Sequence, residues 1–267
     1  MGVSVADSLQ RSGHRLYWLP AGRSPQTWQR AKEHQLIPTD SIKELSRKCT
    51  VIISVCPPQA AEAVARQVVA VDFHGLYIDA NAISPQLTNL IASVIERAGA
   101  NYVDGGIIGG PAWEPGTSLF LSGPRAYEAA SLFTTGPLEV KVISEQVGKA
   151  SALKMCYAAY SKGSTALLAA VLAAAEKLEV RVELENEWAS EDASFVERTH
   201  QRTRKVTAKA WRFTGEMAQI ASTFQGAGLP PGFHLAAEEL YQRLAHFKDA
   251  DKTPSLEEVL VALTEPQ

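Results

Sequence analysis

The chain has 267 residues, of which 46% are hydrophobic and 21% charged, which excludes a disordered or fibrous protein and allows one large or two moderate domains. Its net charge of −3 gives no electrostatic reason to expect binding to nucleic acid or to a membrane surface. Its three cysteines lack the spacing of a disulfide framework or a zinc site, and no stretch reaches the ~20 uninterrupted apolar residues of a spanning helix. We therefore expect a cytoplasmic protein without a metal.

The N-terminal half alternates short β-branched runs with amphipathic stretches, a pattern typical of a parallel sheet covered by helices. We expect an α/β domain over residues 1–145 and an all-helical domain over residues 146–267. The first predicted element is a helix from Val3 to Arg11, with Gly13 at its C-terminal cap. Strands are predicted at residues 15–18, 50–55, 76–79, 102–104, 118–121 and 139–143.

This order places a helix before any strand. In a Rossmann domain, a strand and a Gly-x-Gly-x-x-Gly turn precede the first helix, whose N-terminus receives the pyrophosphate of a dinucleotide. Gly2 would be the third glycine of that turn. The pattern thus predicts a Rossmann-type sheet whose first strand and first two glycines would lie upstream of Met1. The alternative is that Gly2 is an ordinary N-terminal residue.

After Ser144 the composition becomes rich in Ala, Leu, Glu and Lys, and no further strand is predicted. Residues 150–178 contain no Pro and one Gly, which predicts a long connecting helix. Two later helices carry apolar stripes that we expect to face the core: Phe213, Met217, Ile220 and Phe224, and then Phe233, Ala237, Leu240, Leu244 and Phe247. We interpret the basic run at residues 198–205 as a solvated helix face rather than a phosphate or partner site.

Five stretches, in this order and spacing, carry a family resemblance: Ile53-Ser54-Val55-Cys56-Pro57-Pro58, residues 79–85, residues 102–110, residues 154–158, and Pro231-Gly232-Phe233-His234. Together they resemble the 3-hydroxyisobutyrate and 6-phosphogluconate dehydrogenase superfamily, in a poorly characterised branch with its own C-terminal helical domain. The resemblance covers nearly the whole chain. It implies an oxidoreductase with an NAD(P)-binding Rossmann-like domain.

Two turns are predicted to line the cofactor. The first, formed by Ser54, Val55, Cys56, Pro57 and Pro58, follows a predicted strand, at the sheet edge where open α/β sheets bind ligands. The resemblance implies cofactor contact there, and the alternative is a plain Pro-Pro turn.

In the second turn, Asn81 follows the next strand, and the resemblance implies a hydrogen bond to the nicotinamide side. Asn81 could equally cap a helix that starts near Pro85.

The loop after the strand at residues 15–18 bears on the choice of cofactor. It lacks the carboxylate that would accept hydrogen bonds from ribose hydroxyls, whereas Arg23 and Ser24 offer a guanidinium and a hydroxyl to a 2′-phosphate. We therefore predict NADP rather than NAD. The alternative is a solvated loop arginine.

Lys154 lies in an Ala-rich run, where desolvation would lower the pKa of a lysine. The resemblance implies that this lysine takes the proton of the substrate hydroxyl while hydride moves to the nicotinamide. The alternative is a lysine that reaches water from a helix face.

The substrate loop departs from the family pattern. Ile108 stands before Gly109 and Gly110 where the family carries Ser, and Ala158 replaces the family's Asn one helical turn after the lysine. Both losses predict a larger or less polar substrate, or one held by other groups. The candidates for such groups are His234 and Glu216, which could also be ordinary surface residues.

Three functions therefore stay open. The first is an NADP-linked enzyme acting on a hydroxyl/carbonyl pair, the second is an imine reductase, and the third is a non-catalytic dimeric paralogue. The small residues Ala158, Ala159 and Gly163 predict a helix surface suited to a homodimer, unless later helices of the same chain cover it.

Overall fold

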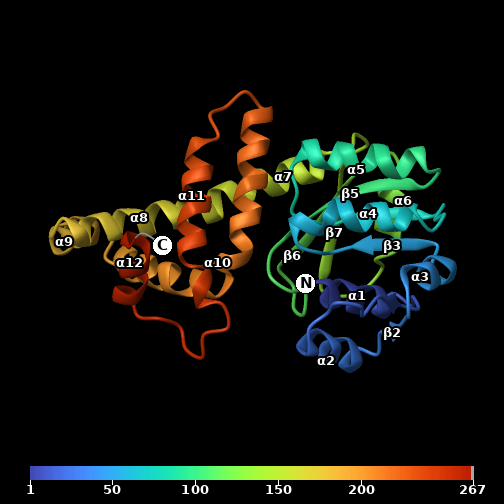
Figure 1. Cartoon of the computed structure of the whole chain (residues 1–267), viewed down its shortest axis with the longest axis horizontal. Helices are drawn as coiled ribbons and strands as arrows, with labels where there is room; N and C mark the ends of the chain where they lie inside the picture. The colour runs from blue at the N-terminus through green and yellow to red at the C-terminus, as the bar shows by residue number, and fades with distance from the viewer. Residues whose placement is uncertain (266–267) are drawn as a thin grey trace. The chain divides into compact units, whose positions relative to one another are not determined.

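The computed structural model describes residues 1–265, which form two compact units that divide after Met155 (Figure 1). The first unit is an α/β domain, and the second contains helices only among its described residues. The expected fold class, an α/β domain followed by a helical domain, is confirmed.

A five-stranded sheet runs through the first unit in the order β3–β4–β5–β6–β7. Its strands are β3 (Val51–Ser54), β4 (Leu76–Asp79), β5 (Asn101–Ile108), β6 (Thr117–Ser122) and β7 (Leu138–Ser144). Neighbouring strands are parallel except for β5 and β6, so the sheet is mixed rather than wholly parallel.

A second, two-stranded sheet pairs β1 (Tyr17–Trp18) with β2 (Ile37–Pro38) in parallel. The strand at β2 was not predicted, because two residues ending in proline give no alternating pattern. Within residues 1–265 no strand pairs with both β1 and β3, so the two sheets are separate and the outer edge of β3 has no neighbour.

β5 extends beyond its prediction. We expected it to end at Asp104 because glycines follow, yet Gly105 and Gly106 continue the strand. Glycine serves here to allow close approach of other backbone: a Cβ on Gly105 would lie 3.0 Å from the carbonyl oxygen of Asp79.

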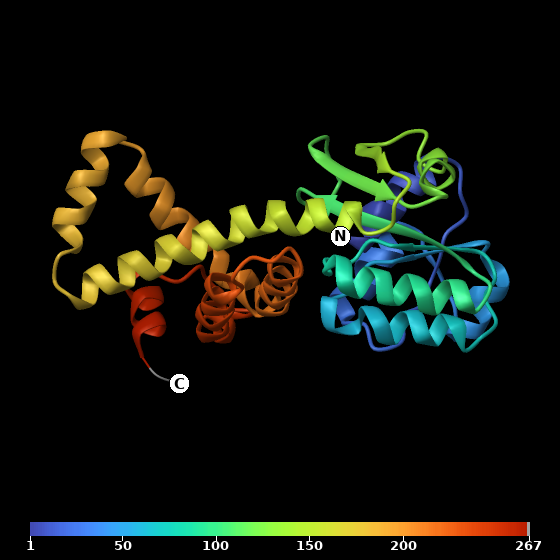
Figure 2. The ribbon, with the colours of Figure 1, turned by 90° about the horizontal axis from the view of Figure 1, so that it is seen from above.

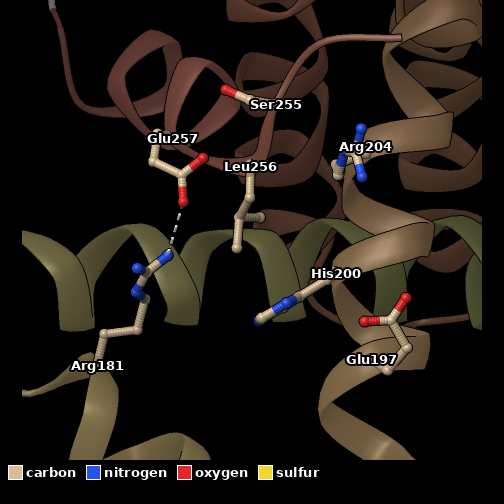
Figure 3. A pocket seen from close by; sticks show the side chains of 7 residues that line it. All are labelled: Arg181, Glu197, His200, Arg204, Ser255, Leu256 and Glu257. Atoms are coloured by element: carbon tan, nitrogen blue, oxygen red, sulfur yellow. Dashed lines mark ion pairs between the residues drawn. The ribbon is translucent and has the colours of Figure 1, made fainter.

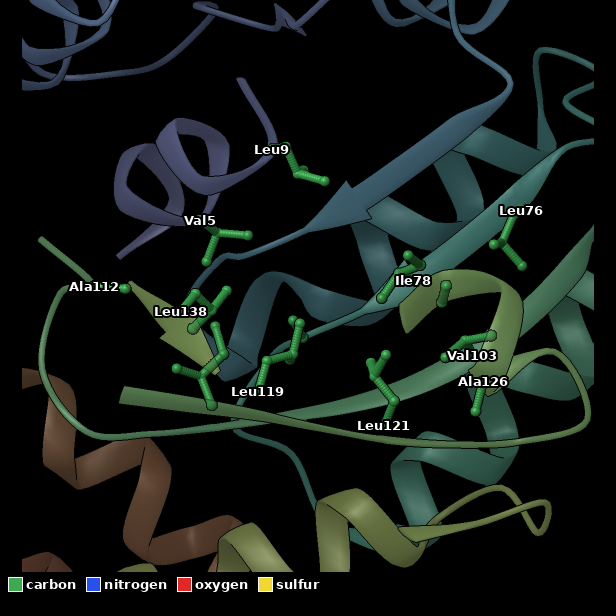
Figure 4. Packing of buried hydrophobic residues seen from close by; sticks show 13 residues of the cluster. Val5, Leu9, Leu76, Ile78, Val103, Ala112, Leu119, Leu121, Ala126 and Leu138 are labelled. Atoms are coloured by element: carbon green, nitrogen blue, oxygen red, sulfur yellow. The ribbon is translucent and has the colours of Figure 1, made fainter. Parts of the chain in front are cut away.

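Helices cover both faces of this sheet. On one face lie α1 (Gly2–Arg11) and α6 (Ala126–Ser131), whose Val5, Leu9 and Ala126 join a cluster with Ile78 and Leu119 (Figure 4). On the other face lie α3 (Ile42–Lys48), α4 (Ala61–Val69) and α5 (Pro85–Arg97). Each fully buried Leu or Ile contributes about 1.5–3 kcal/mol of hydrophobic stabilisation. A further helix of the unit, α2 (Pro25–Glu33), stands between β1 and β2 in the sequence.

A long helix runs from Lys149 to Lys177 (Figure 2), as predicted for residues 150–178. It consists of α7 (Lys149–Ala158), a π-helical segment η2 (Ala159–Gly163) and α8 (Ser164–Lys177). By length and composition it could cross a membrane, but half of its most apolar stretch is buried inside the protein. That burial is typical of the core helix of a globular protein.

The helical unit also contains α9 (Arg181–Glu191), α10 (Phe195–Gly226), α11 (Gly232–Arg243), the 3-10 turn η3 (Ala245–Phe247) and α12 (Leu256–Thr264). In the first apolar stripe, Met217 and Ile220 are buried as predicted. The prediction for Phe233 is wrong, because Phe233 is 48% exposed and His234 beside it is buried. The buried face of α11 follows His234, Ala237 and Tyr241, so the stripe begins one residue later than expected.

Candidate functional site

The turn after β3 is built by a buried asparagine. Asn81 is 2% exposed, its Oδ1 accepts from the backbone N–H of Cys56 at 2.6 Å, and its Nδ2 donates to the Ser54 hydroxyl at 2.9 Å. The Asn81 side chain therefore ties the ends of β3 and β4 together. It does not cap α5, because the hydroxyl of Ser84 accepts from the N–H of Leu87 and performs that role.

The remaining residues of this turn lead directly into α4. Val55 and Cys56 are half-buried, Pro57 is exposed, and the buried Pro58 opens the 3-10 turn Pro58–Ala60. Gly2, the first residue of α1, lies on this turn, since a Cβ built on it would be 3.6 Å from the Cβ of Val55. The structure thus brings the N-terminus of α1 to the end of β3, as a dinucleotide site requires.

Arg23 belongs to the same neighbourhood. Burial raises the pKa of the Cys56 thiol, and the hydroxyl of Ser54 and the positive charge of Arg23 lower it in part. Ser24 is the N-cap of α2, and its hydroxyl accepts from the N–H of Thr27 at 3.3 Å. Ser24 therefore already has a structural partner, whereas the Arg23 guanidinium is exposed beside the turn.

A buried carboxyl group lies at the end of β4. Asp79 is 1% exposed, its Oδ1 accepts from the backbone N–H of Asn81 at 3.1 Å, and its Oδ2 has no hydrogen-bond partner among residues 1–265. Burial, and secondarily the charge of Asp104, raises the pKa of Asp79 to about 7. This carboxyl group therefore changes its charge near neutral pH.

Lys154 lies on α7, and α7 packs against β5. A Cβ built on Gly106 would lie only 3.0 Å from the Cβ of Lys154. Lys154 is half-buried, so it is neither a fully solvated lysine nor a core residue. Because side chains alternate along a strand, Ile108 projects to the same face of β5 as Gly106, the face against which Lys154 packs.

The residues after β5 form a tight loop. Ile108 is the last residue of the strand, Gly109 has a φ of +123°, and the carbonyl oxygen of Gly110 accepts from the Thr117 hydroxyl at 2.9 Å. A Cβ on Gly109 would lie 2.6 Å from that same hydroxyl, so only glycine fits there. Gly109 and Gly110 add backbone groups, but no side chain, to this end of β5.

His234 and Glu216 belong to the helical unit, and both are buried rather than ordinary surface residues. His234 is 4% exposed between the rings of Phe224 and Phe233, and its Nδ1 has no hydrogen-bond partner among the described residues. The Oε2 of Glu216 lies 2.9 Å from the Nζ of Lys162 in the π-helical segment. Burial lowers the pKa of His234, so the ring favours its neutral form.

The basic run lines part of a pocket of about 290 Å³ in the helical unit (Figure 3). Its walls come from α9, α10 and the start of α12: Arg181, Glu197, His200, Arg204, Ser255, Leu256 and Glu257. His200 pairs with Glu185 at 2.9 Å, and the Nε of Arg204 donates to the carbonyl oxygen of Pro254 at 2.8 Å. His200 and Arg204 thus pair within the helical unit, and the exposed residues of the run form the solvated face that we expected.

Three residues that organise the site were not predicted from the sequence. Asp79 and Ser122 are buried polar residues at the ends of β4 and β6, and Asp104 is a buried polar residue in the middle of β5. A polar residue that closes an apolar strand is a weak signal, because many such residues only begin a loop.

These features define an α/β dinucleotide-binding domain followed by a helical domain. Residues 1–133 match the NAD binding domain of 6-phosphogluconate dehydrogenase, and residues 175–244 match a domain of unknown function. An uncharacterized 28.5 kDa protein of Methanothermus fervidus is 31% identical over 157 residues, 59% of this chain. The match spans about 60% of the length of that relative.

Solved structures share the architecture. A conserved protein described as structurally similar to 3-hydroxyacid dehydrogenases is 26% identical, with a TM-score of 0.65 over 91% of this chain and 93% of that one. The 3-hydroxyisobutyrate dehydrogenase of Mycobacterium tuberculosis, solved with L-serine, is 17% identical, with a TM-score of 0.71 over 99% and 96% of the two chains. An imine reductase from Myxococcus stipitatus in complex with NADP+ is 13% identical, with a TM-score of 0.55 over 99% and 96%. The chain belongs to the 3-hydroxyisobutyrate and 6-phosphogluconate dehydrogenase superfamily, in a branch with its own C-terminal helical domain.

Proposed function

We propose that the protein is an NADP-dependent oxidoreductase that acts on a hydroxyl/carbonyl pair, with Lys154 as its general acid/base. One observation carries the proposal: Lys154 packs on β5 at Gly106, near the strand ends, in a chain whose first 133 residues match an NAD binding domain. Ligands of open α/β sheets bind at these carboxyl ends.

In this proposal each residue has a limited task. NADP, when bound, supplies the hydride transfer. The turn Ser54–Pro58 lines the cofactor, and Asn81 holds that turn in place through two hydrogen bonds. Lys154 accepts the proton of the substrate hydroxyl during oxidation and returns it during reduction. The loop Ile108–Gly110 borders the substrate.

The preference for NADP rests on Arg23. The guanidinium lies near the turn after β3, where it would pair with a 2′-phosphate. We expect Arg23→Gln to weaken NADPH binding about tenfold, the order of one charge-assisted hydrogen bond, and to leave NADH binding unchanged. Equal losses for both nucleotides would contradict the choice of NADP.

Calorimetric titration with NADPH and NADH tests the proposal as a whole. We expect NADPH to bind more tightly than NADH, because only NADPH offers a 2′-phosphate to Arg23. NADPH oxidation is then followed with a panel of 3-oxoacids, aldehydes and cyclic imines. Absence of NADPH binding would favour a non-catalytic protein.

Imine reduction is the second candidate. The groups that the family uses to hold a hydroxyacid are replaced here by Ile108 and Ala158, and an imine needs neither of them. Turnover of cyclic imines without turnover of 3-oxoacids would select this alternative.

A cytoplasmic homodimer completes the proposal, but its surface differs from the one that the sequence suggested. Ala158 and Ala159 are buried, and a Cβ on Gly163 would meet the ring of Phe233 at 3.1 Å, so the chain covers these small residues itself. Exposed apolar side chains remain on α8 and just beyond its C-terminus, including Leu167 at 49% and Leu178 at 71%. Analytical ultracentrifugation of the wild type and of Leu167→Glu tests whether this face pairs two copies.

A further inference from the structure

Four polar side chains form one row across the sheet. The strand registers align Ser54 of β3 with Asp79 of β4, Asp79 with Asp104 of β5, and Asp104 with Ser122 of β6. All four residues are at most 4% exposed. Because a buried carboxylate is costly unless it is hydrogen-bonded, the partners of each aspartate indicate what it does.

The partners of Asp104 lie on the first turn of α7. Its Oδ2 accepts from the backbone N–H of Ser151 at 3.0 Å and from the Ser122 hydroxyl at 2.8 Å, and its Oδ1 accepts from the Ser151 hydroxyl at 2.5 Å. The Ser122 hydroxyl accepts in turn from the N–H of Ala150 at 3.0 Å. First-turn N–H groups have no partner within their own helix, and the helix dipole favours a negative charge there. Asp104 and Ser122 therefore cap α7 from the sheet.

A hydrogen bond from α5 and a close contact on β5 complete this attachment. The Thr88 hydroxyl lies 2.8 Å from that of Ser151. A Cβ on Gly106, two residues after Asp104, would lie 2.6 Å from the carbonyl oxygen of Ala150 and 3.0 Å from the Cβ of Lys154. Any side chain at position 106 would push α7 away from the strand. The cap thus sets the position of α7 along β5, and Gly106 sets its height above the sheet.

We propose that Asp104, Ser122 and Gly106 are positioning residues that fix where the Lys154 amine lies at the end of β5. This inference rests on the proposed function, in which Lys154 exchanges the proton with the substrate. Lys154 follows Ala150 by one helical turn, so movement of the first turn is transmitted directly to it. A displacement of about 1 Å in a reacting group can lower a rate about 100-fold, so this attachment matters for catalysis.

The test measures the position of Lys154 through its chemical reactivity, which needs neither cofactor nor substrate. The folded protein is labelled with N-hydroxysuccinimide acetate, and the acetylation rate of Lys154 is read by peptide mass spectrometry against Lys177. We expect Asp104→Ala to raise this rate about tenfold, the order expected for loss of a charge-assisted hydrogen bond. Asp104→Asn keeps one acceptor oxygen and should have a smaller effect. Ser151→Ala, which removes a donor on the helix side, gives an independent variant if the Asp104 variants do not fold.

Asp79→Asn is the matched control. Asp79 lies in the same row with the same burial, but its hydrogen bond goes to Asn81 and not to α7. We expect the acetylation rate of Lys154 to stay at the wild-type value in this variant. Equal acceleration in the Asp79 and Asp104 variants would overturn the inference, because it would reflect general loosening. An unchanged Lys154 rate in Asp104→Ala and Gly106→Ala would overturn it as well.

Turnover separates this inference from the proposed function. With the oxoacid or imine that the wild type reduces, Asp104→Asn and Gly106→Ala should lower kcat and leave the Kd for NADPH unchanged. If Lys154→Met keeps full turnover while the labelling result stands, the acid/base role is wrong and the attachment of Lys154 is right. If turnover depends on Lys154 but not on Asp104 or Gly106, the positioning role is wrong.

Discussion

The two units bury polar side chains in different ways. At the carboxyl edge of the sheet, Ser54, Asp79, Asp104 and Ser122 come from four strands and form a row with links to Asn81 and α7. In the helical unit, buried polar groups act singly or in pairs, as in the ion pair between Lys162 and Glu216. Strand register places several polar groups side by side, whereas helix packing brings together one pair at a time. The comparison suggests that the first arrangement serves chemistry and the second serves packing.

The strongest test of this comparison is Lys154→Met, which removes the amine but keeps the bulk of the side chain. We expect kcat to fall about 1000-fold, the scale of general acid/base catalysis, with the Kd for NADPH unchanged. Lys149→Met is the matched control, because Lys149 is exposed on the same helix. Steady-state kinetics and nucleotide titration give both quantities. Full activity in Lys154→Met would contradict the proposed acid/base role of Lys154 in the first unit.

The next test concerns the pH dependence that Asp79 gives to stability. Burial raises the pKa of Asp79 to about 7 from its ordinary value of 3.8, so between these values the folded chain binds a proton that the unfolded chain releases. Stability from this group is present at low pH and is lost as pH rises through about 7. The unfolding free energy of the wild type minus that of Asp79→Asn should therefore fall by up to about 4 kcal/mol from pH 4 to pH 8. Urea unfolding across this range checks it, and a constant difference would contradict it.

The ion pair of the helical unit gives a comparable test without any link to catalysis. The Lys162 and Glu216 side chains are 12% and 11% exposed, so Glu216→Gln leaves a nearly buried lysine without its carboxylate. We expect a loss of about 3 kcal/mol in unfolding free energy. The double variant Lys162→Met, Glu216→Leu should lose less than the single one, because no unpaired charge remains. Urea unfolding measures both, and a larger loss in the double variant would argue against a packing role.

The smallest effect is expected at His234. Burial lowers its pKa below the ordinary 6.5, so the unfolded chain binds the proton more readily than the folded one. Stability from the neutral ring is therefore present above that value and is lost as pH falls. Relative to His234→Gln, the wild type should lose thermal stability between pH 7 and pH 5. An equal response of both proteins to pH would show that the ring titrates freely.

The first unit shows how far local pattern reaches. The β-branched run at residues 50–55 and the apolar stretch at residues 76–79 predict β3 and β4 closely. The pattern fails for β2, whose two residues are held by pairing with β1, and for the end of β5, where glycines continue the strand. In both cases a neighbouring backbone, not the local residue preference, decides the structure.

The candidate site divides in the same manner. The Ala-rich context of Lys154 and the Pro-Pro turn after β3 were visible as local features. The hydrogen bonds of Asn81 to Cys56 and Ser54 were not, because they join residues separated by 25 and 27 positions. His234 was hidden for a related reason: the apolar period pointed to Phe233, but the packing of α11 buries the next residue.

The sequence alone determined most of the strands and helices, because side-chain branching and apolar period act over a few residues. It also located the lysine and the strand-end turns, since both stand out from their neighbours. Only the tertiary structure decided that Asp104 and Ser122 hold the helix of Lys154, because strand register brings together groups that are far apart in the chain. The two buried aspartates of one row, Asp79 and Asp104, have different hydrogen-bond partners there, and their roles differ for that reason.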